Sequence, residues 1–321
     1  RPPVLPVFLA VCYRLFGYSH FSAHLTSLCF SFIVLYLTFK IHKELLESEY
    51  QWISPLILIT TYLWINYTHL INQELLLVAV EMLGIYYIIK TSEKSQNYIY
   101  LLSTVWIGIG FFIKTYMIII PIIAILPYVL IFKRFLLKKY YFWLGILIGF
   151  IPVIVWGLLC FDLYGMSFVE GINNKLISLS RENTFSQPFY YYIWNILLSL
   201  LPWTPFCING IFKTAQTKLI KNYYFILIYP LLIIILLSLF ETKTPYYTLQ
   251  VIPFFSILCS KSLLDFCFNI SNQNLKIIKK YSKNLIFSLI IIFVFLISLR
   301  QDLFNNKIFS ASLLSFLILL L

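Results

Sequence analysis

Residues 108–121 read GIGFFIKTYMIIIP, an almost wholly apolar stretch that holds one charged residue, Lys114. Taken alone, such a lysine can mark a helix end whose side chain extends to the lipid headgroups. The alternative is an anion-binding residue at a membrane surface. We favour the anion site, because the topology derived below places Lys114 on the same membrane side as most of the other isolated charges.

The composition indicates a polytopic membrane protein. Of 321 residues, 61% are hydrophobic and only 11% are charged, and the mean hydropathy is +0.88. A soluble domain of this size cannot bury so much apolar surface. The net charge of +12 does not indicate nucleic acid, because the lysines form short clusters between apolar runs, as in cytoplasmic membrane loops.

The apolar runs predict an all-α fold with about eleven transmembrane helices, each long enough, or nearly so, to cross a hydrocarbon core of about 30 Å. Residues 1–17 form a shorter segment interrupted by Arg14, which we expect to lie as a helix at the interface. Residues 18–321 are then one multi-span domain with an outer loop at 162–188. The predicted spans are 21–39, 52–70, 72–89, 98–113, 115–132, 141–161, 189–208, 223–240, 246–260, 285–299 and 308–321.

The distribution of lysine and arginine predicts the orientation. Sixteen of the 24 basic residues lie in alternate loops, which the positive-inside rule assigns to the cytoplasm. Those loops are 40–51, 90–97, 133–140, 209–222 and 261–284. The N-terminus, Lys114, the 162–188 loop and residues 241–246 therefore face outward. We expect an integral plasma (inner) membrane protein with its active face in the periplasm.

Cysteine and histidine give no sign of a metal site. The six cysteines are scattered, mostly inside apolar runs, without a CxxC pair, and the four histidines show no ligand spacing. Packing is the ordinary role of such cysteines. We therefore expect no disulfide framework, no metal and no cofactor.

Two carboxylates share one face of the predicted span 72–89. Glu74 opens the span and Glu81 follows seven residues later, about two helical turns on. A carboxylate within an apolar run is a functional hypothesis by default. For Glu74 we consider a general base, an acceptor for a sugar hydroxyl, or the partner of a lysine. For the deeper Glu81 we expect a protonated or hydrogen-bonded structural carboxyl.

Three further groups lie on the predicted outer side. Lys243 stands in the turn TKTPYY, residues 242–247, where it is either part of an interfacial lysine and aromatic belt or a second cation for a phosphate-linked head group. Tyr246 and Tyr247 are candidate hydroxyl donors to a substrate. Arg181, in the long outer loop, either pairs with Glu182 or contacts substrate, because long loops at a rim often cover a site.

The joint placement of these residues is more informative than any one of them. A site on the outer face has no access to cytoplasmic nucleotide sugars. A lipid-linked donor that has already been flipped outward fits this placement. A transporter or flippase is the main alternative, although transporters usually bind near the bilayer midplane, and a non-enzymatic scaffold is a third.

The sequence resembles the GT-C membrane glycosyltransferases, which include protein O-mannosyltransferases and the aminoarabinose transferase of lipid A. The resemblance runs in family order over residues 1 to about 260. It rests on RPPVLPVFLAVCYRLFG at 1–17, SHFSAHLTSLCFSFIVLYLTF at 19–39, Asn72-Gln73-Glu74, the 108–121 stretch, PFYYYIWNILLSLLPWTPF at 188–206 and ETKTPYYTLQVIPFFSIL at 241–258. Against the family pattern, His24 replaces the usual arginine and Thr115 replaces the glycine that follows the lysine.

The resemblance implies transfer of a sugar from a polyprenyl phosphate to a lipid or protein acceptor. It places Arg1, Lys114 and Lys243 around the donor phosphate and gives Glu74 a sugar or acceptor role. The family's first acidic motif, whose aspartate is thought to be the base, would lie before Arg1. We therefore expect a chain truncated at its N-terminus, with its base outside this sequence, or an inactive protein.

Overall fold

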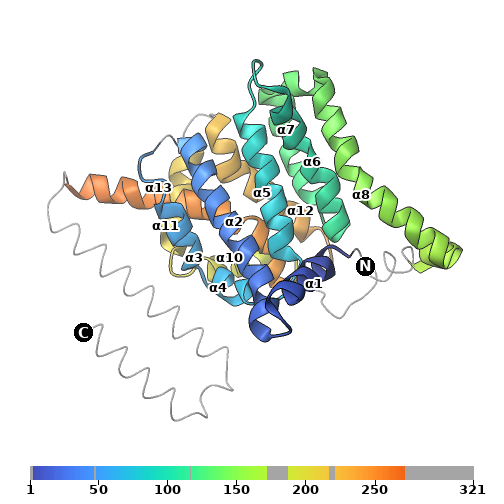
Figure 1. Cartoon of the computed structure of the whole chain (residues 1–321). Coiled ribbons are helices and arrows are strands. Elements are labelled where there is room, and N and C mark those ends of the chain that lie inside the picture. The colour runs from blue at the N-terminus through green and yellow to red at the C-terminus, as the bar shows by residue number, and fades with distance from the viewer. Residues whose placement is uncertain (1–2, 47, 116, 172–186, 217–220, 272–321) are drawn as a thin grey trace, which may run out of the picture. The chain divides into compact units, whose positions relative to one another are not determined.

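The computed structural model describes residues 3–46, 48–115, 117–171, 187–216 and 221–271. The secondary-structure elements among these residues are helices. The chain divides into two units, Arg1–Leu263 and Leu264–Leu321. Figure 1 shows the helices of the first unit. They are α1 Val4–Phe16, α2 His20–Leu46, α3 Ile53–Ile59, α4 Tyr62–Thr68, α5 Glu74–Lys90, α6 Asn97–Lys114, α7 Ile119–Phe132, α8 Tyr140–Tyr164, α10 Tyr191–Ser199, α11 Thr204–Gln216 and α12 Tyr229–Ser238. Helix α13, Ile252–Ser271, starts in the first unit and ends in the second. The 3₁₀ helices are η1 Arg134–Lys138, η3 Lys221–Tyr223 and η5 Pro245–Gln250. The element η4, Tyr224–Ile228, is a π-helix.

Helix length supports a membrane-embedded fold. Among the described residues, α2, α6 and α8 are each long and apolar enough to cross a membrane. Helices α10 and α11 add a fourth candidate if they are counted as one span broken by a 117° bend. The all-α prediction is confirmed for the described residues. The predicted count of about eleven spans is not established by these lengths, and the segments 285–299 and 308–321 lie outside the described residues.

Two predicted spans are broken where they contact each other. The span predicted at 52–70 is divided into α3 and α4, and the one predicted at 189–208 bends between α10 and α11. At the contact, the Tyr62 N–H donates to the Leu201 carbonyl at 3.2 Å, and the Trp203 Nε1–H donates to Thr60 Oγ1 at 2.8 Å. One backbone group at each break, the Tyr62 N–H and the Leu201 carbonyl, therefore has its partner in the other helix pair, which suits an apolar environment.

Helices α5, α6 and α7 form an up-down-up array (Figure 1), in which α5 packs against α6. Helix α5 runs from Glu74 to Lys90, and α6 returns to Lys114, so Glu74 and Lys114 lie at the same end. Helix α7 returns to the opposite end, where the buried Lys133 ammonium donates to the Ile89 carbonyl at 3.1 Å and to the Thr91 carbonyl. Lys133 thereby caps the last turn of α5.

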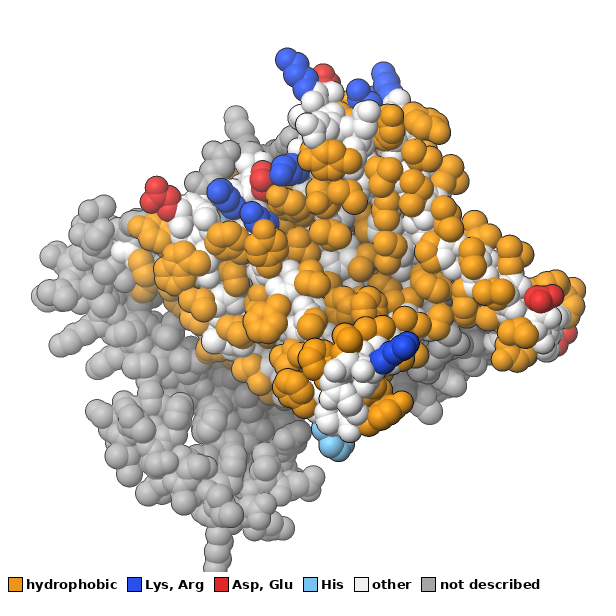
Figure 2. Space-filling view, in the orientation of Figure 1, with side chains coloured by type: hydrophobic (Ala, Val, Ile, Leu, Met, Phe, Trp, Pro, Cys, Tyr) orange, Lys and Arg blue, Asp and Glu red, His pale blue; other side chains and the backbone are white. Residues whose placement is uncertain are grey.

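Glycines allow close contact between α6 and α8. A Cβ atom added to Gly108 would lie 2.1 Å from the Gly149 carbonyl carbon, and one added to Gly149 would lie 2.4 Å from the Val105 oxygen. Gly145 similarly faces Thr104. This is the small-xxx-small contact typical of membrane helices. Much of α8 outside this contact is exposed and apolar, and hydrophobic side chains cover a wide band of the face shown in Figure 2, which suits contact with lipid tails.

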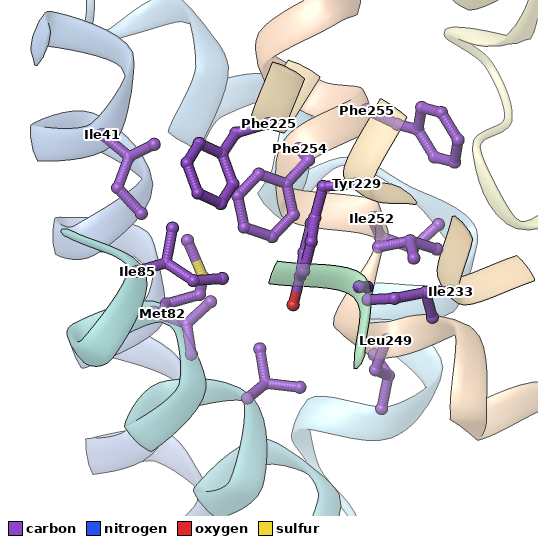
Figure 3. Close-up of a cluster of buried hydrophobic side chains, with 14 of the residues drawn as sticks. Ile41, Met82, Ile85, Phe225, Tyr229, Ile233, Leu249, Ile252, Phe254 and Phe255 are labelled. Atoms are coloured by element: carbon purple, nitrogen blue, oxygen red, sulfur yellow. The ribbon is translucent and has the colours of Figure 1, made fainter. Parts of the chain in front are cut away.

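The core of the first unit surrounds Tyr229 (Figure 3). Its ring contacts Phe254 and Phe225 at centroid distances of 5.0 and 5.6 Å. The Tyr229 hydroxyl donates a hydrogen bond to the fully buried Glu81. The expected hydrogen bond of the Glu81 carboxyl is therefore confirmed, with a partner from α12, and its structural role stays a prediction.

Candidate functional site

The centre of the candidate site is an ion pair between two helix ends. Helix α5 begins at Glu74 and α6 ends at Lys114, and the Lys114 ammonium contacts the Glu74 carboxylate. The Lys114 side chain is 16% exposed and the Glu74 side chain 10%. Each charge also stands at the helix end that favours it, because the N-terminus attracts anions and the C-terminus attracts cations. Of the three roles considered for Glu74, the lysine partner is the one visible in the structure.

The start of α5 is held by a local side-chain cap. Asn72 Oδ1 accepts hydrogen bonds from the Glu74 N–H at 3.2 Å and the Leu75 N–H at 3.5 Å. An asparagine before a helix satisfies backbone N–H groups that have no partner within the helix. The backbone position of Glu74 is therefore fixed independently of its ion pair.

Two tyrosines of η5 complete the surroundings of the lysine. The Lys114 nitrogen lies 4.7 Å from the centroid of the Tyr247 ring and 5.3 Å from that of Tyr246. The two rings are 4.9 Å apart in an edge-to-face arrangement. Such cation–π contacts stabilise an ammonium without neutralising it. Four residues singled out from the sequence, Glu74, Lys114, Tyr246 and Tyr247, thus lie together although they come from three separate segments.

Sequence reasoning missed Tyr67 as a neighbour of this group. Tyr67, on α4, packs edge to face on Tyr246 at a centroid distance of 6.0 Å. The sequence offered one indication of this contact, because Tyr67 lies next to the short connection that leads from α4 to Glu74. The contact itself depends on the packing of this connection against η5, which the sequence does not show.

Lys243 is buried and makes backbone contacts. Its ammonium donates to the Phe240 carbonyl at 2.6 Å and to the Gln187 carbonyl at 2.9 Å. The next residue, Thr244, donates its N–H to the Tyr192 hydroxyl at 3.3 Å. Lys243 therefore joins the turn before η5 to the segment that leads into α10. Its assignment to the donor phosphate stays a prediction.

The remaining predicted site residues, Arg1 and Arg181, lie outside the described residues. Within the described part of the chain, no group of three or more His, Cys, Asp or Glu side chains is placed to hold a metal ion. The chemistry that the described site offers is that of one ammonium, one carboxylate and several phenol hydroxyls. Such a set can bind a phosphate and the hydroxyl groups of a sugar.

Comparison with known proteins gives one family and two similar structures. Residues 1–157 match the family described as dolichyl-phosphate-mannose-protein mannosyltransferase. The fold resembles the crystal structure of ArnT from Cupriavidus metallidurans bound to undecaprenyl phosphate, with a TM-score of 0.70 and 16% identity, and the apo state of the same protein, with 0.66 and 17%. Each match covers 82% of this chain and 49% of the other. The chain therefore spans about half the length of the structures it matches, and the similarity establishes a GT-C fold.

Proposed function

We propose that this chain, which has the GT-C fold of ArnT and matches the dolichyl-phosphate-mannose-protein mannosyltransferase family over residues 1–157, is a glycosyltransferase that uses a polyprenyl-phosphate sugar. The similar ArnT structure is described as bound to undecaprenyl phosphate. Both comparisons support a donor in which a sugar is linked to a lipid phosphate. The acceptor in this proposal is a lipid or a protein.

The observation that carries the proposal is the placement of Lys114. When the sugar passes to the acceptor, the bond between its anomeric carbon and the phosphate oxygen breaks, and the polyprenyl phosphate leaves as an anion. A fixed cation beside that leaving oxygen stabilises the charge that develops in the transition state. Lys114 is held at the end of α6 by two aromatic rings, where its ammonium is already oriented. Because the surroundings are mostly buried, its charge acts with less screening than a charge in water.

The other predicted residues take secondary roles. Glu74 accepts a hydroxyl of the sugar or of the acceptor, and Tyr246 and Tyr247 donate hydroxyls to the substrate. Lys243 and Arg1 provide further positive charge for the phosphate, and Arg181 contacts the substrate.

The topology is also part of the proposal. About eleven spans cross the inner membrane, residues 1–17 lie at the outer interface, and 18–321 form the transmembrane domain with an outer loop at 162–188. The reaction then takes place on the periplasmic face.

Binding of undecaprenyl phosphate tests the phosphate role. We would measure its equilibrium dissociation constant for the protein in nanodiscs of neutral lipid, and compare Lys114→Ala with Lys138→Ala, an exposed lysine at the opposite end of the array. Loss of a charge-assisted hydrogen bond predicts at least about tenfold weaker binding for Lys114→Ala and no change for the control. Equal affinities for wild type and Lys114→Ala would refute the role of Lys114.

A transporter or flippase remains the alternative. It rests on Glu81, since a carboxylate deep in a span is typical of ion pathways. In the structure Glu81 is fully buried and bonded to Tyr229 within the hydrophobic core, which favours the structural role. Movement of a fluorescent polyprenyl phosphate across liposomes containing the protein, absent from empty liposomes, would support the transporter instead.

A further inference from the structure

The charge of Lys114 is already matched by an anion of the chain itself. The Glu74 carboxylate contacts the same ammonium that the proposed function assigns to the donor phosphate. We infer that Glu74 is an internal competitor of the phosphate: binding of a polyprenyl phosphate displaces the carboxylate from Lys114 and frees it to accept a hydroxyl of the substrate. This inference rests on the proposed function and adds to it a coupling between donor binding and the availability of Glu74.

Electrostatics makes the two anions exclusive. Glu74 is only 10% exposed, so a phosphate placed on Lys114 would lie beside a carboxylate that water screens poorly. Two like charges about 4 Å apart repel more strongly in such a poorly screened place than they do in water. The cost is avoided if the Glu74 side chain turns away from the lysine as the phosphate arrives.

The surroundings allow this exchange without loss of the cation's position. Tyr246 and Tyr247 hold the ammonium through their ring faces, and these neutral contacts do not compete with an anion. Asn72 fixes the backbone at the start of α5, so the Glu74 side chain can change rotamer while the helix stays in place. The carboxylate can thus exchange for another anion, and it remains within reach of the same site.

The first test is the affinity of the protein in nanodiscs for undecaprenyl phosphate. Glu74→Gln removes the competing charge and keeps the size of the side chain, so we expect binding to tighten at least about fivefold, the lower end of typical coupling between two ligands, while sugar transfer slows. The matched control is Glu93→Gln, which removes an exposed carboxylate at the other end of α5 and α6 and leaves affinity unchanged. Unchanged or weaker binding by Glu74→Gln would overturn the inference.

A second measurement uses the wild-type side chains and does not depend on the variant folding. A carbodiimide joins a lysine to a carboxylate in direct contact, and mass spectrometry can quantify the Lys114–Glu74 cross-link relative to modification of Glu93. We expect saturating undecaprenyl phosphate to lower the cross-link yield severalfold. An unchanged yield, with the lipid shown to be bound, would mean that the carboxylate is not displaced.

The two proposals fail in different ways. If the wild-type protein does not bind undecaprenyl phosphate, the proposed function itself is wrong. If the wild type binds it, Lys114→Ala weakens binding and Glu74→Gln binds like the wild type, the phosphate role stands and only the competition is refuted.

Discussion

A double-mutant cycle on Glu74 and Lys114 measures how strongly the two helix ends are coupled. The variants are Glu74→Gln, Lys114→Met and the double substitution. In fully exposed pairs the coupling is about 0.2–1 kcal/mol, whereas unit charges about 4 Å apart at an effective dielectric constant of about 20 attract by about 4 kcal/mol. The side chains here are 16% and 10% exposed, which places the pair between these limits. We expect a coupling of about 2 kcal/mol, or about thirtyfold in the unfolding equilibrium.

The assay is reversible unfolding in mixed detergent and SDS micelles, followed by helical circular dichroism. Each single substitution leaves a mostly buried charge without its opposite, so each should destabilise more than half as much as the double substitution. The coupling is the sum of the two single effects minus the double effect. A coupling below about 0.5 kcal/mol would refute the account of a poorly screened contact and would indicate that water separates the two side chains.

Three further substitutions test the fold that positions the site. In the same unfolding assay, Gly108→Ala should destabilise the protein by about 1–3 kcal/mol, because the added methyl group overpacks the contact with α8. The control is Gly157→Ala, which should have little effect because an added Cβ there meets nothing within 4 Å. Lys133→Met leaves the carbonyls at the end of α5 without their donor and should cost about 1–3 kcal/mol; stability equal to wild type would exclude the cap. Tyr229→Phe removes the hydrogen bond to Glu81 and should cost a similar amount, and an additional Glu81→Leu should recover part of it, because both polar groups are then gone.

The broad architecture was predictable from residue type and spacing. Glu74 and Lys114 lie at one end of the helices α5, α6 and α7, and Lys133 lies at the other. This placement follows from the sequence, in which apolar runs alternate with short connections on one side and basic loops on the other. The same reasoning correctly placed Tyr246 and Tyr247 at the end that holds Glu74 and Lys114. The family resemblance pointed to the fold.

Partner identity was not predictable, because it depends on contacts between residues far apart in the chain. Glu81 was expected to be hydrogen-bonded, but its donor, Tyr229, is 148 residues away. Lys243 was considered for a phosphate or for the interface, and neither alternative included the backbone carbonyls that it contacts. The broken helices near Thr60 and Leu201 read as continuous apolar runs, since the hydrogen bonds that join the two breaks link residues far apart in the chain.

The central claim is that a donor phosphate binds at Lys114, and photo-crosslinking tests it most directly. A polyprenyl phosphate with a photoreactive group next to its phosphate would be added to membranes containing the protein, irradiated, and the labelled peptides identified by mass spectrometry. The account predicts labelling within 108–121 and 241–247, reduced by excess undecaprenyl phosphate. Labelling confined to the basic segments 90–97 and 133–140, at the opposite end of α5, α6 and α7, would contradict it.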